Sequence, residues 1–286
     1  MAAASATKTA PLASGKGGEE PKAARKRAPV WDADRIKVSE AVWGAGEVGP
    51  VAKKFLPPLL PTLALDPAMT AIEIGSGLGS LSCKMHLNSG VYTIGFESDP
   101  VLLEKAKESA LHWGLGRKTK FHALNLRKPE FESIRKKSIH CVVMHSTVTQ
   151  VANISKVFDV LSDLLAPGAR LLLTDYFVSD DRGDVRALKK WTGLQPGPTF
   201  MITVTEFKEI LINLGFEIHV DEDLTDPFRN YVRGAWEEFL KGVAEGAYPL
   251  DELGPALLES TRWMAGTRSL KVGGLQFRRV SATLRN

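Results

Sequence analysis

The sequence predicts an α/β protein in which helices cover a parallel β-sheet. From residue 71 onward, short apolar runs of the strand type alternate with longer segments whose apolar residues recur at helical spacing. This alternation is typical of parallel strands joined by crossover helices. The first strand also stops at a run of glycines that leads directly into a helix, and sheets of this kind bind ligands at such turns.

Seven strands follow from short runs of apolar and β-branched residues. The first run is short and wholly of the buried type, whereas the last alternates apolar and polar residues, which is the two-residue period of a strand. The predicted strands are residues 71–74, 91–96, 120–124, 139–144, 169–174, 216–220 and 275–282.

Four helices are predicted between these strands, at residues 80–87, 100–113, 157–165 and 205–214. The first follows the glycine run. The second has a proline in its first turn and ends at a glycine, and the third is closed by a Pro-Gly pair. The fourth is expected to be capped by Thr205 and stopped by Gly215.

Two long segments, residues 178–202 and 224–274, do not follow this alternation. Insertions of that size in a compact domain are commonly functional, and both contain several aromatic residues. We therefore expect one domain over residues 31–286, in which the two insertions form helical lids around a substrate pocket.

The net charge of +4 comes from the N-terminal 30 residues. Of 37 basic and 33 acidic residues, six and two lie in this segment, so that the rest of the chain holds 31 of each sign. Residues 1–30 have few large apolar side chains, and we expect them to form a disordered basic tail. A neutral body lacks the broad basic face with which proteins neutralise phosphates, so no nucleic acid partner is expected.

The cysteines and the hydropathy indicate a cytoplasmic protein. Two cysteines, Cys83 and Cys141, are too few for a disulfide framework and fit a reducing compartment. No apolar run approaches the roughly 18 residues that cross a bilayer, so no membrane span is expected.

The most informative segment is Glu73-Ile74-Gly75-Ser76-Gly77-Leu78-Gly79-Ser80, between the first strand and the first helix. Glycines there allow a sharp turn and a close approach of a ligand to the backbone. A dinucleotide fingerprint would place its third glycine at position 80, where this chain has a serine. The carboxylate of Glu73 would repel a pyrophosphate but suits the ammonium group of an amino-acid ligand.

Polar residues also follow the next two strands. Glu97 ends the second strand, 22 residues after Gly75, where a carboxylate can accept both hydroxyls of a ribose. The pair Asn125-Leu126 follows the third strand and can read the edge and cover the face of an adenine ring. Three consecutive strand ends therefore offer partners for an ammonium group, a ribose and an adenine.

These motifs, in this order, resemble those of the class I S-adenosylmethionine-dependent methyltransferases. Residues 73–79 are similar to the family's first motif, Glu97 to its ribose acid, Asn125 to its adenine-reading position, and residues 164–176 to its Pro-Gly segment before the fifth strand. The resemblance covers about residues 36–223 and the last strand. It implies a Rossmann-like sheet of seven strands, mostly parallel with an antiparallel last strand, and S-adenosyl-L-methionine as the cofactor.

An upstream segment narrows the resemblance to one branch of the family. Residues 42–49 look like the aromatic and glycine stretch that closes over the cofactor in phosphoethanolamine N-methyltransferases and related small-molecule enzymes, and residues 199–207 resemble another segment of that branch. The cofactor contacts that the resemblance implies are Trp43, Gly44, Glu73, Ile74, Gly75, Ser76, Gly77, Glu97, Ser98, Asn125, Leu126 and His145.

The sequence departs from that branch at its substrate positions. The branch's catalytic tyrosine and histidine fall at Ser39 and Gln150, and two of its phosphate-holding positions fall at Pro196 and Pro198. A related small molecule with a different headgroup therefore fits better than phosphoethanolamine does.

Methyl transfer needs placement of the reactants and, for a hydroxyl or a protonated amine, a general base. His145 ends the fourth strand, beside the expected methyl position, and an imidazole titrates near neutral pH. The alternative is that His145 only contacts the cofactor or caps the strand. Tyr176, at the end of the fifth strand, is placed to orient the substrate.

No metal site is predicted, because the six histidines show no i, i+4 pairing and the cysteines lie far apart. Three classes of function stay open. The first is methyl transfer to a nitrogen or oxygen of a small molecule. The second is a non-catalytic cofactor-binding or regulatory protein on the same fold. The third is a NAD(P)-dependent oxidoreductase, against which Glu73 and Ser80 argue.

Overall fold

A computed structural model describes residues 30–131, 134–181, 183–248 and 253–285. The prediction of a disordered tail over residues 1–30 lies, apart from residue 30, outside the described residues. Among the described residues, no helix is both long and apolar enough to span a membrane.

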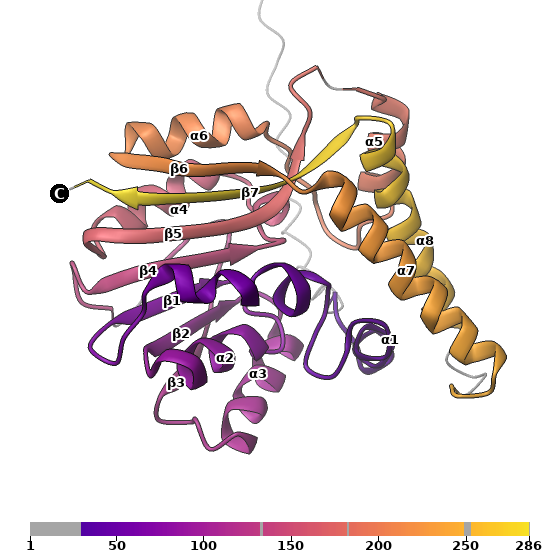
Figure 1. Cartoon of the computed structure of the whole chain (residues 1–286), viewed down its shortest axis with the longest axis horizontal. Helices are drawn as coiled ribbons and strands as arrows, with labels where there is room; N and C mark the ends of the chain where they lie inside the picture. The colour runs from indigo at the N-terminus through magenta and orange to yellow at the C-terminus, as the bar shows by residue number, and fades with distance from the viewer. Residues whose placement is uncertain (1–29, 132–133, 182, 249–252, 286) are drawn as a thin grey trace, which may run out of the picture.

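The sheet has seven strands in the order β3-β2-β1-β4-β5-β7-β6 (Figure 1). The first five strands along the chain pair in parallel, whereas β7 lies antiparallel between β5 and β6. The predicted fold class is thereby confirmed. The strands are β1 (Thr70–Ile74), β2 (Tyr92–Glu97), β3 (Thr119–Ala123), β4 (Ile139–His145), β5 (Leu165–Val178), β6 (Phe216–Asp223) and β7 (Leu275–Leu284).

Helices cover both faces of the sheet because successive strand residues point to opposite sides. One face packs against α2 (Ser80–Ser89) and against side chains of the second insertion, and the other packs against α4 (Ile154–Ser162) and α6 (Val204–Asn213). The helix α3 (Pro100–His112) packs beside β2 and β3. The result is a three-layer core in which the central strands are buried on both sides.

Several predicted boundaries were wrong, and three of them have a clear local reason. The strand β5 begins at Leu165 rather than at residue 169, because Leu165 already pairs with Ile139 before a register shift in β4. The expected Pro-Gly stop therefore lies inside β5, and α4 ends at Ser162. The helix α6 is capped by Thr203 rather than by Thr205, in a capping box with Glu206.

The segment before the sheet is also helical. It contains α1 (Ala33–Trp43), a π-helical turn η1 (Val51–Phe55) and a 3₁₀ helix η2 (Pro57–Leu63). The side chain of Asp32 caps α1 by accepting a hydrogen bond from the amide of Arg35.

The two insertions fold as helices that gather at one end of the sheet (Figure 1). The first contains α5 (Val185–Gly193), and the second contains α7 (Thr225–Ala244) and α8 (Leu253–Lys271). The helices α5 and α7 both pack on α8, and α1 packs on α7 and α8. The insertions and the N-terminal helix therefore form one layer beside the strand ends.

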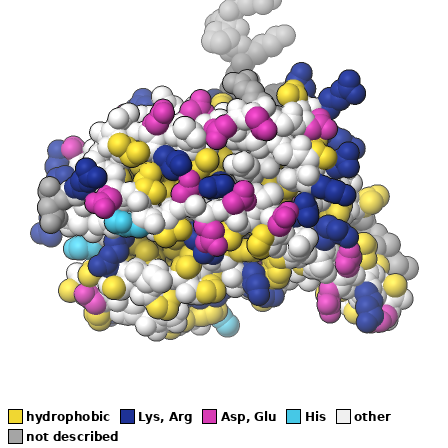
Figure 2. Space-filling view, turned by 45° about the horizontal axis from the view of Figure 1, so that its top comes forward, with side chains coloured by type: hydrophobic (Ala, Val, Ile, Leu, Met, Phe, Trp, Pro, Cys, Tyr) yellow, Lys and Arg dark blue, Asp and Glu magenta, His cyan; other side chains and the backbone are white. Residues whose placement is uncertain are grey.

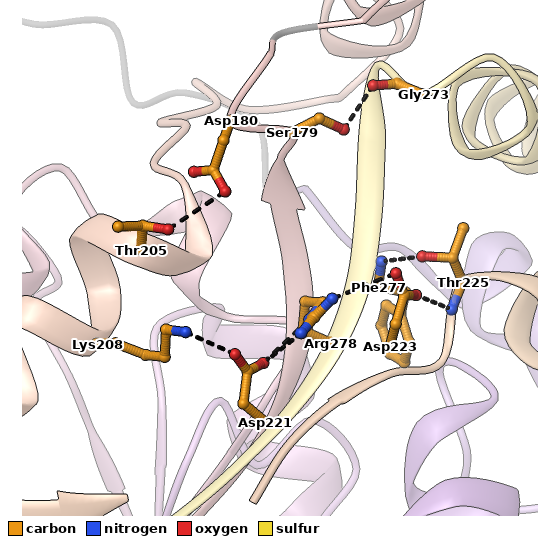
Figure 3. A network of polar contacts seen from close by, with 10 residues as sticks. All are labelled: Ser179, Asp180, Thr205, Lys208, Asp221, Asp223, Thr225, Gly273, Phe277 and Arg278. Carbon is orange, nitrogen blue, oxygen red and sulfur yellow. Dashed lines mark hydrogen bonds and ion pairs between the residues drawn. The ribbon is translucent and has the colours of Figure 1, made fainter.

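Polar contacts fix this layer where it joins the sheet (Figure 3). The amide of Phe277 in β7 donates to Thr225 Oγ1 at the start of α7 (3.0 Å), and Ser179 Oγ donates to the carbonyl of Gly273 (2.5 Å). Beside them, Arg278 and Lys208 both pair with Asp221. Both insertions are thus held where β5 ends and β7 begins.

Acidic and basic side chains are interspersed over much of the face shown in Figure 2. The ion pairs of the sheet edge illustrate this arrangement, since Arg279 pairs with Glu222 next to the pair of Arg278 with Asp223.

Candidate active site

A cavity of about 370 Å³ lies between the carboxyl ends of the strands and the layer formed by α1 and the insertions. In open α/β sheets this crevice is the usual ligand site. Its sheet side includes residues of the glycine turn, Glu97, His145 and Tyr176. The opposite side comprises Trp31 and Arg35 near the N-terminus and, from the insertions, Trp191, Gln195–Thr199, Glu259, Arg262, Trp263 and Gly266.

The glycine turn forms one wall of the cavity. Gly75 has a φ of 80°, and a Cβ atom on it would lie 2.0 Å from Thr147 Oγ1, so no other residue fits without rearrangement. The hydroxyl of Ser76 is buried and bonds to no described residue, although Ser76 lines the cavity. A buried hydroxyl without a partner is unfavourable, so a ligand that bonds to it would relieve this cost.

Glu97 lies next to this turn and is shielded from solvent. Its Oε2 accepts from the amide of Gly77 (2.8 Å), and its Oε1 accepts from the amides of Ser98 (2.7 Å) and Asp99 (2.9 Å). Burial raises the pKa of Glu97, against the effect of these three hydrogen bonds. Because each carboxylate oxygen can accept two hydrogen bonds, Oε2 retains capacity for a ligand hydroxyl.

Glu73 and His145 form a pair, in which His145 stands in the cavity wall and Glu73 lies behind it. His145 Nε2 lies 2.9 Å from Glu73 Oε1, and the Glu73 side chain is completely buried while that of His145 is 10% exposed. The other carboxylate oxygen of Glu73 accepts from Ser82 Oγ at 2.6 Å. His145 lines the cavity and Glu73 does not.

Three nearby carboxylates raise the pKa of His145. Burial lowers the pKa of its imidazole. The hydrogen bond and charge of Glu73, together with the charges of Glu47 and Asp175, outweigh this effect, so that the pKa lies above its ordinary value. The ring is therefore better able to hold a proton than a free imidazole.

Asp175 fixes the loop that follows His145. One of its carboxylate oxygens accepts from the amides of Thr147 (2.6 Å) and Val148 (2.8 Å), and the other accepts from the amide of Tyr176 (2.8 Å). Burial nevertheless raises the pKa of Asp175 to about 6. This carboxylate thus binds the backbone at the start of the 3₁₀ helix η3 (Val148–Gln150), which lies beside the cavity.

A charged cluster lies on the side formed by α1 and α8. Glu259 pairs with both Arg35 and Arg262, and its Oε1 lies 2.7 Å from Arg35 Nε. Arg262 Nε also donates to the carbonyl of Leu194 (3.0 Å), and the guanidinium of Arg35 lies 3.7 Å from the ring centroid of Trp31. Burial, and also the nearby charge of Arg262, lower the pKa of Arg35. Two guanidinium groups thus share one carboxylate in the cavity wall.

The structure brings most of the predicted site residues together. Those that line the cavity are Gly75, Ser76, Gly77, Glu97, Ser98, Leu126, His145 and Tyr176. Leu124, which was not predicted, lies in the wall beside Leu126.

Five predicted cofactor contacts lie outside the cavity wall. Trp43 and Ile74 are completely buried in the core, and Gly44 caps α1. Glu73 lies behind His145, as described above. Asn125 is exposed, and its side chain accepts from the amides of the following turn instead of facing the cavity. The resemblance placed these residues by sequence position, which does not determine where a side chain points.

Glu47 is a cavity residue that sequence reasoning missed. Its Oε1 accepts from Ser80 Oγ (2.7 Å) and pairs with Lys84 Nζ (2.6 Å), while no described residue bonds to its Oε2. Glu47 lies in the glycine-containing stretch of residues 42–49, in which the resemblance indicated Trp43 and Gly44 instead. The charged cluster of Arg35, Glu259 and Arg262 carried no recognisable sequence signal.

Comparisons with known proteins point to methyltransferases. The methyltransferase-domain family matches residues 48–220. Phosphoethanolamine N-methyltransferase of Plasmodium falciparum is 24% identical over 219 residues, covering 73% of this chain and 79% of the relative. Phosphoethanolamine N-methyltransferase 3 of Arabidopsis thaliana is 22% identical, covering 68% of this chain but only 38% of the relative.

A solved structure has the same fold. It is phosphoethanolamine N-methyltransferase 2 of Haemonchus contortus in complex with phosphomonomethylethanolamine and S-adenosylhomocysteine. The TM-score is 0.75 at 17% identity, over 89% of this chain and 59% of that one. The present chain therefore spans little more than half the length of this structural relative.

The sheet order, with β7 antiparallel between β5 and β6, and the glycine turn after β1 define an α/β protein of the methyltransferase type. The chain belongs to the methyltransferase-domain family. The sequence-based prediction of an S-adenosylmethionine-dependent methyltransferase, resembling the phosphoethanolamine branch, is thereby confirmed.

Proposed function

We propose that this chain transfers the methyl group of S-adenosylmethionine to a nitrogen or oxygen atom of a small-molecule acceptor, with His145 as the general base. The observation that carries the proposal is the position of His145. It stands in the wall of a cavity that has the glycine turn and Glu97 on one side and the helical insertions on the other.

The cofactor is proposed to lie against the glycine turn. Ser76 supplies an unpartnered hydroxyl and Glu97 a carboxylate oxygen with spare capacity, and Leu124 and Leu126 supply an apolar surface for an adenine. We assign the ammonium group to Glu47, because its Oε2 bonds to no described residue. This arrangement fits a nucleoside joined to an amino acid.

S-adenosylmethionine, when bound, supplies a methyl group on a positively charged sulfur that accepts the electrons of the breaking S–C bond. The residues of the chain align the acceptor and take its proton. The acceptor's nitrogen or oxygen donates an electron pair to the methyl carbon as the S–C bond breaks. The proton of its N–H or O–H bond passes to His145 and then to water. Trp191, Trp263 and Tyr176 exclude water from this side of the cavity.

The acceptor is proposed to carry an anionic group on a scaffold other than phosphoethanolamine, which gives the relatives their name. Arg35 and Arg262 both pair with the carboxylate of Glu259 in the cavity wall, and Asp32 also lies close enough to Arg35 for its charge to act there. Two guanidinium groups at one wall are the donors that suit an anionic group of the acceptor. Pro196 and Pro198 line the cavity where that branch has phosphate-holding residues, and a proline has no backbone N–H or polar side chain to donate.

We also propose that the protein acts in the cytoplasm, because Cys83 and Cys141 are both free and buried.

The proposal is tested by methyl release from S-adenosylmethionine with a panel of amines, phenols and carboxylated small molecules, phosphoethanolamine included. The expected result is turnover of a member other than phosphoethanolamine, with kcat lowered about 10²- to 10⁴-fold in His145→Gln. A matched control is His140→Gln. His140 lies at the other end of β4, where its ring accepts from the amide of Thr70, so kcat should not change.

Isothermal titration with S-adenosylhomocysteine and with NAD accompanies the panel. Binding of S-adenosylhomocysteine without turnover of any acceptor would favour a non-catalytic role. Binding of NAD in its place would contradict the proposal altogether.

A further inference from the structure

We infer that Glu73 is a positioning residue, which holds the His145 imidazole in the tautomer whose Nδ1 faces the cavity. This inference rests on the proposed function, in which His145 is the general base. It gives Glu73 a role different from the one expected of an acid before a glycine turn, which is to hold the ammonium group of the cofactor.

The pairing of β1 with β4 brings the two residues together. Glu73 lies opposite Val143 in the parallel register. Side chains two residues apart on a strand share a face, so His145 points to the same side as Glu73. The contact between Glu73 Oε1 and His145 Nε2 is therefore built into the sheet and does not depend on a loop.

Both carboxylate oxygens of Glu73 already have protein partners. Oε1 faces His145 Nε2, Oε2 accepts from Ser82 Oγ, and the side chain is completely buried. Glu73 does not line the cavity, whereas Glu47 does. A ligand in the cavity therefore does not contact Glu73, but it can contact His145, which does.

The acceptor-only character of a carboxylate determines the tautomer. Because ionised Glu73 cannot donate, the hydrogen bond of 2.9 Å requires a proton on His145 Nε2. In the neutral ring the lone pair then lies on Nδ1, to which no described residue bonds. Since His145 lines the cavity, Nδ1 is the atom available to take the proton of an acceptor.

The surrounding charges favour the product of that proton transfer. The charged groups that act on His145 from neighbouring elements are Glu73 on β1, Glu47 in the loop after α1 and Asp175 on β5, and all three are acids. Lys84, the cation closest to Glu47, is paired with it. When Nδ1 takes a proton, the imidazolium forms between carboxylates that are already in place, as pre-organised stabilisation requires.

The test uses Glu73→Gln, which removes the charge but keeps an oxygen for His145 Nε2 and an amide group for Ser82. The imidazole nitrogens of His145 are observed by ¹⁵N NMR over a pH titration, with His145→Gln used to assign the signal. In the wild type we expect a proton on Nε2 and a pKa above the ordinary value. In Glu73→Gln the pKa should fall, and in Glu73→Leu the tautomer should no longer be fixed.

The same variants are measured for cofactor binding and turnover. For Glu73→Gln we expect the affinity for S-adenosylhomocysteine to stay within about twofold and kcat at pH 7 to fall by about 10- to 100-fold. The acid limb of the kcat profile should move to lower pH, while KM for the acceptor stays unchanged. A purely structural role would not move the limb. If Glu73→Leu does not fold, Glu73→Gln still decides the charge and the profile.

Two results would overturn the inference. One is loss of S-adenosylhomocysteine binding in Glu73→Gln with an unchanged NMR titration of His145, which would make Glu73 a cofactor ligand. The other is a wild-type His145 whose neutral ring carries its proton on Nδ1. An error in the proposed function, in which His145 is the general base, would be seen separately, as full activity in His145→Gln. The NMR titration decides the tautomer in either case.

Discussion

The indole rings of Trp43 and Trp263 pack with their centroids 4.7 Å apart, so that the end of α1 rests on the middle of α8. Trp43 also contacts Trp236 and Tyr231 of α7 and is completely buried, whereas Trp263 reaches the cavity. The pair thus links the N-terminal helix to the second insertion, and only one of its members can touch a ligand.

Replacing Trp43 by alanine is therefore expected to lower stability and to leave the intrinsic affinity for the cofactor unchanged. The free energy of unfolding should fall by about 3–5 kcal/mol, because a large buried side chain leaves a cavity. Urea denaturation measures this change. Trp113→Ala is the matched control, since Trp113 is 48% exposed and its loss should change stability by less than about 0.5 kcal/mol. Weaker binding of S-adenosylhomocysteine by a Trp43→Ala protein of normal stability would instead support Trp43 as a cofactor contact.

The carboxylates of Glu97 and Glu47 are expected to make different contributions to cofactor binding. Glu97→Ala should reduce the affinity for S-adenosylhomocysteine by at least about 100-fold, because it removes charge-assisted hydrogen bonds to the ribose hydroxyls. Glu47→Gln should reduce it by about 10-fold, since an amide replaces the partner of the ammonium group. Isothermal titration gives both values, and an unchanged affinity would remove the corresponding assignment.

Lys84→Met separates the charge of Glu47 from its ion pair. The substitution removes the contact of 2.6 Å between Lys84 Nζ and Glu47 Oε1 but leaves the carboxylate, so the affinity for a ligand ammonium group should hold or rise. A loss as large as that in Glu47→Gln would mean that Glu47 acts only by anchoring α2 through this pair.

Gly75→Ala is expected to destabilise the fold and to weaken cofactor binding. The residue has a left-handed backbone, and the new Cβ would meet Thr147 Oγ1 at 2.0 Å, so that strain and overpacking together cost about 2–4 kcal/mol. Thermal denaturation and isothermal titration measure the two effects. Gly193→Ala is the control, because nothing lies within 4 Å of its Cβ position at the end of α5. It should be neutral or stabilise by up to about 1 kcal/mol.

The parts of the site that could be predicted are those with a short-range cause. The turn at residues 75–77 follows from glycines directly after a buried strand, and Glu97 follows from its place at the end of the next strand. Both lie in the cavity wall. The fold class was equally accessible, since the alternation of strand and helix patterns fixes the layers.

The remaining parts depend on contacts between distant segments. Glu73 and His145 are 72 residues apart, and only the register of β1 with β4 shows that they touch. The pairing of Arg35 with Glu259 requires α8 to pack on α1, which no amphipathic pattern specifies. Asn125 shows a related limit, because its sequence position predicts an adenine contact, whereas its side chain accepts from the amides of a local turn.

Asp175 offers a prediction about stability and pH. Its carboxylate is buried and organises the backbone beside His145, yet its pKa rises from 3.8 to about 6 in the folded protein. A carboxyl group with a raised pKa stabilises the fold when it is protonated. Its contribution is therefore fully present below the unfolded-state pKa and is lost as the pH rises through the folded-state pKa.

Asp175→Asn removes this titration and leaves one oxygen to accept hydrogen bonds. The free energy of unfolding of the wild type, relative to that of Asp175→Asn, should fall by about 3 kcal/mol between about pH 4 and pH 6 and then stay constant up to pH 8. The variant should also lose turnover at neutral pH, because the amides of Thr147 and Val148 both depend on one carboxylate oxygen. Urea denaturation of both proteins at several pH values measures the difference. A difference that stays constant from pH 4 to pH 6 would show that the pKa of Asp175 is not raised in the folded protein, which would contradict the prediction.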